Sequence, residues 1–95
     1  MNYSIFKTDW NTGSTTLVCG GSHDDELQCR MHWQAYLYGF MDGAYELLGY
    51  GKFAMMNGKR TLSFQINIPG KKLTEYFMLF DKEAQDLIDQ ISKEG

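Results

Sequence analysis

The sequence predicts an α+β fold in which an antiparallel sheet of about five strands packs on one long central helix, with a short amphipathic helix near the C-terminal end. Three observations carry this prediction. A helical pattern of apolar residues extends from about residue 23 to residue 48. Two strand-like segments precede this pattern and three follow it. A second, shorter helical pattern comes after the last strand, so the predicted element order is ββαβββα.

The N-terminal segments 3–7 and 14–19 have the composition of two short strands. The residues between them include Asp9, Asn11 and Gly13, which favour a tight reversal of the chain. Gly20 and Gly21 are expected to end the second strand. We therefore predict a β-hairpin that leads almost directly into the long helix.

The long helix is predicted to begin near residue 22 or 23. Ser22 and Asp25 have the spacing of a capping box, and Asp24 and Glu26 add carboxylates that favour a first helical turn. Apolar side chains cover more than half of the helix circumference, so the helix is expected to be deeply embedded. The pattern stops at residues 49–51, where Gly49 can serve as a C-cap.

A second hairpin is predicted from segments 52–56 and 59–68, which flank Asn57 and Gly58. Asn-Gly favours a two-residue turn because both residues tolerate positive φ. Within the second of these segments apolar and polar residues alternate, which predicts one buried and one solvated face. The buried set is Leu62, Phe64 and Ile66, and the solvated set is Thr61, Ser63, Gln65 and Asn67.

The last strand is predicted over residues 73–80, which are apolar on both faces. This composition is typical of a central strand covered on two sides, or of a strand in a subunit interface. Asp81 is expected to cap the final helix. The apolar positions of that helix follow the spacing of an amphipathic helix: Ala84, Leu87, Ile88 and Ile91.

Length and composition indicate one ordinary globular domain over residues 1–95. Hydrophobic residues make up 43% of the chain and charged residues 22%, which does not fit a disordered or fibrous protein. We find no apolar stretch of signal-peptide length at the N-terminus and no run near the roughly 18 residues that span a membrane. The sequence therefore predicts a cytoplasmic protein without membrane association, whose two cysteines are free thiols.

All cysteines and histidines of the chain lie within fourteen residues, at Cys19, His23, Cys29 and His32. Thiolate and imidazole groups are zinc ligands, and Cys29 and His32 are spaced to share one side of a helix. A helix that begins near residue 22 would place His23 on the opposite side of its axis from His32. We therefore predict no metal or cofactor, and keep a small metal-dependent protein using this Cys/His cluster as an alternative.

A strip of small residues is predicted on the narrower face of the long helix, at Ala35, Gly39 and Gly43, with Asp42 and Glu46 at its rim. Glycine inside a helix costs about 1 kcal/mol relative to alanine, so two glycines suggest close packing. One explanation is internal, with a strand or the second helix lying on the strip. The other is that a partner protein or a second copy of this chain docks on these five residues.

The middle of the chain is basic, although the net charge is −3. Residues 47–74 contain no acid and five cations, which are Lys52, Lys59, Arg60, Lys71 and Lys72. Together with the nearby rings of Phe53, Phe64, Tyr76 and Phe77, these cations could bind an anionic partner such as a nucleic acid through hairpin 52–72. The overall acidity argues against that function, and lysines also protect the edges of sheets.

We find no catalytic motif in the sequence. We therefore predict a small non-enzymatic protein-binding module that acts by surface complementarity and requires no cofactor, with a homodimer as one form of it. Small, acidic, aromatic-rich chains of this kind occur among inhibitors and regulators encoded by phages and mobile elements, and by association this chain is expected to be a protein of that type. The nucleic-acid-binding module and the metal-dependent protein are the alternatives.

Overall fold

The computed structural model describes residues 1–70 and 73–94, and it confirms the predicted fold class and the order ββαβββα. Five strands form one sheet, and two helices accompany it. The elements are β1 (Asn2–Asp9), β2 (Ser14–Ser22), α1 (Glu26–Leu48), β3 (Ala54–Asn57), β4 (Ser63–Asn67), β5 (Thr74–Phe80) and α2 (Asp81–Glu94).

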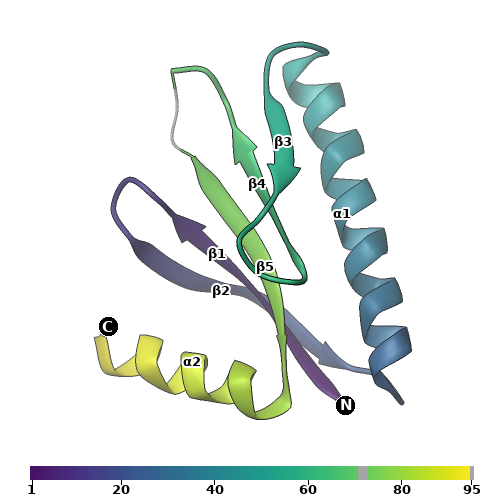
Figure 1. Ribbon diagram of the computed structural model, residues 1–95, viewed down its shortest axis with the longest axis vertical. Coiled ribbons are helices and arrows are strands. Elements are labelled where there is room, and N and C mark those ends of the chain that lie inside the picture. Colours follow the sequence, from purple (N-terminus) through teal and green to yellow (C-terminus); the bar gives the residue numbers. More distant parts are fainter. Residues whose placement is uncertain (71–72, 95) are drawn as a thin grey trace.

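The strands lie in the order β2-β1-β5-β4-β3, and each neighbouring pair is antiparallel (Figure 1). The first and last strands of the chain therefore lie side by side, with Tyr3 opposite Phe80 and Phe6 opposite Phe77. The prediction that residues 73–80 form a central strand is confirmed, because β5 has a neighbour on each side. At the two edges lie β2, with nine residues, and β3, with four.

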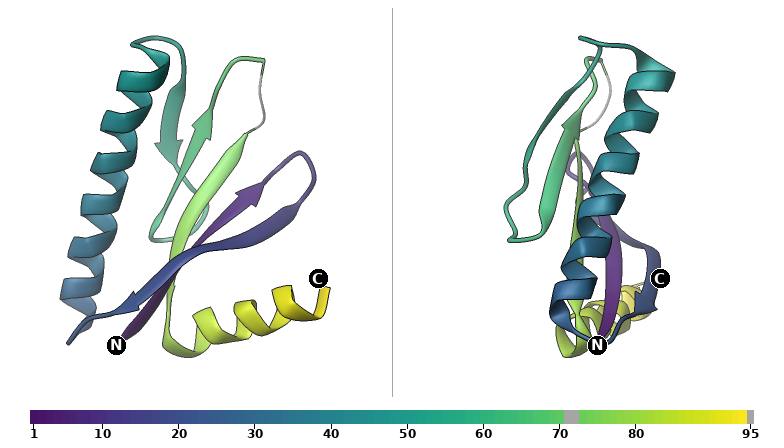
Figure 2. Two further views of the ribbon diagram at one scale, coloured as in Figure 1. Left: turned by 180° about the vertical axis from the view of Figure 1, so that it is seen from behind. Right: turned by 90° about the vertical axis from the view of Figure 1, so that its right-hand side faces the viewer.

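Each helix packs on its own face of the sheet. Because successive strand residues point to opposite faces, Ile5 and Met78 join Trp33 of α1, whereas Phe6 and Phe77 join Ala84 of α2. The predicted apolar positions of α2 are confirmed, since Leu87, Ile88 and Ile91 pack against this second cluster. Two views of the ribbon show the long α1 running along the sheet and α2 crossing it near one end (Figures 1 and 2).

Strand β2 is longer than predicted, because Gly20 and Gly21 continue it to Ser22. Gly21 lies opposite Tyr3 on β1, and a Cβ at this glycine would lie 2.6 Å from the Tyr3 Oη. The glycines therefore do not break the strand. Their lack of a side chain leaves space for the Tyr3 ring, which packs in the core on the α1 side of the sheet.

Helix α1 begins three residues later than the predicted capping box implies. Its N-cap is Asp25, whose side chain accepts a hydrogen bond from the backbone N–H of Gln28 at 2.9 Å. The Gln28 side chain in turn accepts from the backbone N–H of Asp24 at 3.2 Å. Ser22 cannot take the cap position because it is the last residue of β2. The helix ends at Leu48, and Gly49 is the C-cap as predicted.

The second predicted hairpin is confirmed, but the prediction of a two-residue turn at Asn57 and Gly58 is wrong. β3 pairs with β4, and the connecting loop spans residues 58–62 between Asn57 and Ser63. Hydrogen bonds to Ser63, the first residue of β4, close the loop: Gly58 N–H donates to the Ser63 carbonyl, and Arg60 N–H donates to Ser63 Oγ at 2.9 Å. A type I′ turn needs positive φ at both central residues, whereas neither Asn57 nor Gly58 has one.

Loop 58–62 folds over the carboxylate of Glu75, which is 2% exposed. The Lys59 backbone N–H donates to Glu75 Oε2 at 3.3 Å, and Trp10 Nε1 donates to Oε1 at 3.2 Å. Gln65 Nε2 donates to the same Oε1 at 2.7 Å. The expectation that Gln65 is solvated is therefore wrong, because its amide is needed beside a buried carboxylate.

Asp81 begins α2 with a φ of 44°, which a non-glycine residue seldom adopts. Its side chain accepts a hydrogen bond from the backbone N–H of Asn2 at 2.8 Å. The side chain that was expected to cap α2 thus ties the start of this helix to the start of β1.

Candidate functional site

The outward side of α1 carries an unpaired stripe of large apolar side chains. Leu27 is 66% exposed, Met31 is 61% exposed and Tyr38 is 53% exposed. Their spacings of four and seven residues place them on one side of the helix. The opposite side faces the sheet, where Cys29 and Trp33 are buried. The expectation of a deeply embedded helix is therefore wrong, because only one sheet face is there to cover it.

The predicted small-residue strip borders this stripe and is open to solvent. Ala35 and Gly39 are exposed, and a methyl group added at Gly39 or at Gly43 would meet nothing within 4 Å. The internal explanation of the strip is therefore wrong, since neither a strand nor α2 lies on it. We define the outer face of α1 as Leu27, Met31, Ala35, Tyr38, Gly39 and Asp42, with Glu46 and Gly43 at its rim.

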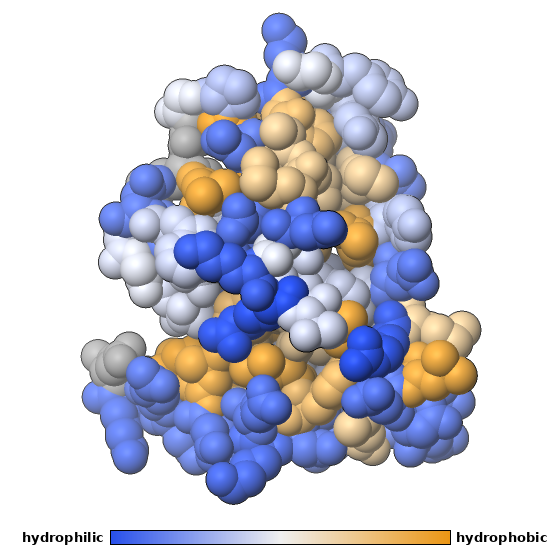
Figure 3. Space-filling view, in the orientation of Figure 1, coloured by the Kyte–Doolittle hydropathy of each residue, from blue (hydrophilic) through white to orange (hydrophobic). Residues whose placement is uncertain are grey.

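Charges on this part of the molecule are mostly negative. Asp42 and Glu46 are exposed, and so are Asp24 and Asp25 at the start of the helix. Arg30 is the cation described on α1, and its Nε lies 3.3 Å from Glu26 Oε2. In the space-filling view an apolar area lies at the lower right, over the first turns of α1, and is bordered by hydrophilic surface (Figure 3). The outer face is thus apolar with an acidic border.

The Cys/His cluster is brought together only in part. His23 Nε2 lies 3.3 Å from His32 Nδ1, and Tyr3 Oη lies 3.1 Å from His32 Nε2. The predicted divergence of the two histidines is wrong, because α1 begins at Glu26 and the preceding connection turns His23 back toward the helix. Both cysteines are free, as expected; Cys29 is fully buried and its thiol donates to the Met1 carbonyl, whereas Cys19 is exposed on β2.

This arrangement does not assemble a metal centre from Cys19, His23, Cys29 and His32. Within residues 1–70 and 73–94, we find no group of three His, Cys, Asp or Glu side chains placed to hold an ion. Instead, the His23 ring stacks on the Tyr3 ring, and His32 shares a hydrogen bond with the Tyr3 hydroxyl. A polar network of this kind fixes the entry of β2 into α1.

The basic residues of the second hairpin do not form one patch among the described residues. Lys52 precedes β3, whereas Lys59 and Arg60 lie in the loop at the opposite end of that strand. The Lys59 ammonium lies 4.5 Å from the Trp10 ring centroid, and the Arg60 guanidinium lies 4.3 Å from that of Phe77. Lys71 and Lys72 are outside the described residues.

The aromatic side chains near these cations are not presented for base stacking. Phe64 and Phe77 are buried, at 3% and 2% exposure. Tyr76 packs against Phe40 and Phe64, and Phe53 packs against Tyr45. The hairpin therefore offers separated cations without the ring surface that single-stranded nucleic acids use.

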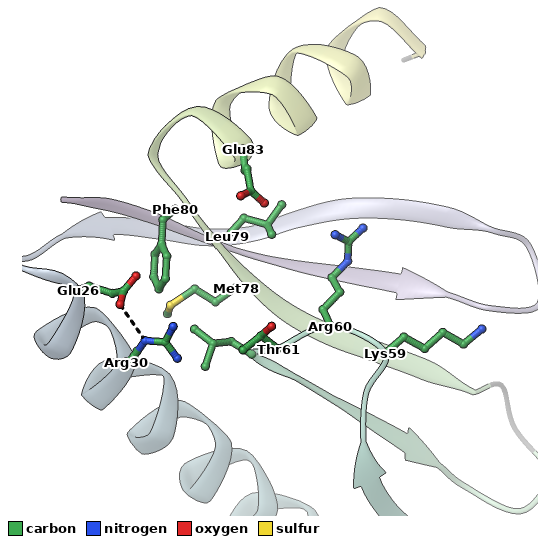
Figure 4. Close-up of a pocket in the computed structure, with 10 residues that line it drawn as sticks. Glu26, Arg30, Lys59, Arg60, Thr61, Met78, Leu79, Phe80 and Glu83 are labelled. Carbon is green, nitrogen blue, oxygen red and sulfur yellow. Dashed lines mark ion pairs between the residues drawn. The ribbon is translucent and has the colours of Figure 1, made fainter.

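A cleft of about 460 Å³ opens between the start of α1, loop 58–62 and the junction of β5 with α2 (Figure 4). Met78, Leu79 and Phe80 line it, and the Glu26–Arg30 ion pair lies at its α1 side. Glu83 points toward Leu79 from α2. The ten lining residues shown include two carboxylates and three cationic side chains, so the cleft presents mixed charge around an apolar floor.

No family model, no curated protein and no solved structure matches this chain. None of the helices in the described part of the chain is long and apolar enough to cross a membrane. The chemistry of the surface is therefore the basis for a functional proposal.

The sequence pattern itself contains a sign of the exposed stripe. When apolar residues cover more than half of a helix circumference, one sheet face cannot bury all of them. Leu27, Met31 and Tyr38 lie on the side of α1 opposite Cys29 and Trp33, so their exposure follows once one face is assigned to the sheet.

Proposed function

We propose that the protein is a non-enzymatic binding module, and that the outer face of α1 is the surface that contacts another protein. The observation that carries this proposal is the exposure of Leu27, Met31 and Tyr38, each more than half exposed on one side of the helix. Contiguous apolar surface with a polar border is typical of protein-binding sites. The open glycines beside it let a partner approach the helix backbone closely.

The charges on this face define the chemistry of the partner. Asp42 and Glu46 border the apolar stripe at one end, and Asp24 and Asp25 lie at the other. A second copy of the same face would bring carboxylates against carboxylates, which is unfavourable. The face instead fits a different protein that presents apolar side chains flanked by lysine or arginine.

The test is affinity capture with two variants of the outer face and a matched control for each. Gly39→Leu adds bulk where there is open space, and Asp42→Lys reverses a border charge. Gln85→Leu places the same apolar side chain, and Asp89→Lys makes the same charge reversal, at exposed positions on α2. Circular dichroism and thermal melting establish that all four variants fold.

We expect one or more basic proteins to be captured by the wild type and by both α2 controls, and to be lost with both α1 variants. Raising the salt concentration should weaken capture, because charge complementarity steers the encounter. Capture that is unchanged by Gly39→Leu and Asp42→Lys would overturn the proposal. Loss with the α2 controls as well would also contradict it, since the binding surface would then lie elsewhere.

A further inference from the structure

The cleft beside the end of β5 has an apolar floor and room for a small organic molecule. β4 begins at Ser63, opposite Phe77, whereas β5 continues to Phe80, so residues 78–80 lie beyond the end of β4. The start of α1, loop 58–62 and α2 surround these residues and leave a volume of about 460 Å³ (Figure 4). Ligand pockets typically measure roughly 300–1,000 Å³. The apolar residues of this lining are Leu62, Met78, Leu79 and Phe80.

Two cations on the loop side of the cleft have no ion-pair partner among the described residues. The Arg60 guanidinium lies 4.3 Å from the ring centroid of Phe77, and the Lys59 ammonium lies 4.5 Å from that of Trp10. A guanidinium that rests on a ring keeps N–H groups at its edge, and these can bind a carboxylate or a phosphate with two parallel hydrogen bonds. The loop side of the cleft is therefore suited to an anionic group.

Hydrogen bonds fix the backbone that carries these two cations. Ser63 Oγ accepts from the Arg60 N–H at 2.9 Å and donates to the Arg60 carbonyl at 2.6 Å. The Lys59 N–H and the Trp10 Nε1 both donate to the carboxylate of Glu75. The loop, both cations and the rings beneath them are thus already in place, which lowers the entropic cost of binding a ligand.

The other sides of the cleft carry two carboxylates, which determine where an anionic group can lie. Glu26 is paired with Arg30, at 3.3 Å. Glu83 points toward Leu79 from α2 and has no ion-pair partner in the part of the chain that the structure describes (Figure 4). Repulsion from Glu83 disfavours an anionic group on the α2 side. An anionic group would therefore lie beside Arg60, on the loop side.

We propose that this cleft binds a small amphipathic anion, in which a carboxylate or phosphate group is joined to an apolar body. The anionic group contacts Arg60 and Lys59, and the body lies on the floor formed by Met78 and Leu79. An inorganic anion would leave the floor uncovered, and a neutral apolar molecule would leave both cations without a partner. The site shares no residue with the outer face of α1, so the proposal stands independently of the function proposed for that face.

The test is a titration of the isotope-labelled wild-type chain, followed by the NMR shifts of its backbone amides. Phenyl phosphate and benzoate carry both an anionic group and a ring. Inorganic phosphate lacks the ring, benzyl alcohol lacks the charge, and an oligothymidylate carries its charges on a polymer. We expect saturable shifts in loop 58–62 and residues 78–80 with at least one aryl anion, at an affinity about tenfold or more above that for inorganic phosphate or benzyl alcohol. The aryl anion that binds more tightly identifies the anionic group.

Three variants locate the anionic group within the cleft. Arg60→Gln should weaken binding of the aryl anion about tenfold, because it removes a charge-assisted hydrogen bond. Lys52→Gln, at an exposed cation outside the cleft, is the matched control and should bind like the wild type. Glu83→Gln should strengthen binding, because it removes a carboxylate from the opposite side. Circular dichroism checks that each variant folds.

Several results would overturn the proposal. One is that neither aryl anion shows saturable binding up to its solubility limit. Another is that inorganic phosphate or the oligothymidylate binds as tightly as the aryl anions, since the cations alone would then be sufficient. An affinity that is unchanged in Arg60→Gln, or lowered in Glu83→Gln, would also contradict the placement of the anionic group.

Discussion

Gln65 on β4 and Glu75 on β5 are register partners, and Gln65 Nε2 donates a 2.7 Å hydrogen bond to Glu75 Oε1. The same carboxylate accepts from Trp10 Nε1 and from the Lys59 backbone N–H. These donors come from the β1–β2 turn, from loop 58–62 and from β4. One buried side chain therefore connects three segments that lie far apart in the sequence.

Replacing Glu75 with alanine should destabilise the protein by about 2–4 kcal/mol, because three donors would be left without their acceptor in a buried site. Urea unfolding measures this change. Glu83→Ala, at an exposed acid on α2, is the control and should stay within about 0.5 kcal/mol of the wild type. Equal stability of the two variants would show that the Glu75 carboxylate does not organise these segments.

Alanine should have opposite effects at two glycines. In Gly21→Ala the new Cβ would lie 2.6 Å from Tyr3 Oη, and the overpacking should cost about 1–3 kcal/mol. In Gly39→Ala the Cβ meets nothing within 4 Å, so helix propensity should stabilise the protein by up to about 1 kcal/mol. Thermal or urea unfolding of the two variants decides the matter. Destabilisation by Gly39→Ala would mean that something packs on the strip.

The two thiols should react at very different rates. Cys19 is exposed, whereas Cys29 is fully buried and donates to the Met1 carbonyl at 3.7 Å. A chromogenic disulfide reagent should therefore modify one thiol quickly under native conditions, and the second only when the protein opens. Cys19→Ser should remove the fast phase and leave the slow one. Two fast thiols in the wild type would contradict the packing of α1 on β1.

Stability should fall at alkaline pH because of the partly buried Tyr36. Burial, with a smaller effect from Tyr76 and Cys19, raises the pKa of Tyr36 from 10.0 to about 12. Between these two pKa values the folded state keeps the Tyr36 proton, whereas the unfolded chain loses it. The contribution of neutral Tyr36 to the free energy of unfolding is therefore complete below about pH 10 and is lost as pH rises toward 12. Urea unfolding at several pH values should show the fall, and Tyr36→Phe should make it shallower. Identical pH profiles for both proteins would contradict this assignment.

Sequence patterns predicted the regular elements better than their ends. Two hairpins, two helices and a central last strand all follow from periodicity and turn residues, and the structure confirms them. The ends differ where a contact from another segment outweighs a local preference. Gly20 and Gly21 extend a strand because Tyr3 needs the space, and Asn57-Gly58 does not form its favoured turn because loop 58–62 is held on Glu75.

Periodicity and composition along the chain are enough to define the α+β class, the element order, the amphipathic face of α2 and the acidic and basic segments. The strand order, the exposure of Leu27, Met31 and Tyr38, and the open space at Gly39 depend on contacts between distant segments and are seen only in the folded chain. The physical reason is that burial is a property of what lies opposite a side chain. Apolar residues around most of a helix predict extensive burial, and only the packed fold shows that the sheet covers one side of α1 and that Leu27, Met31 and Tyr38 on the other side are exposed.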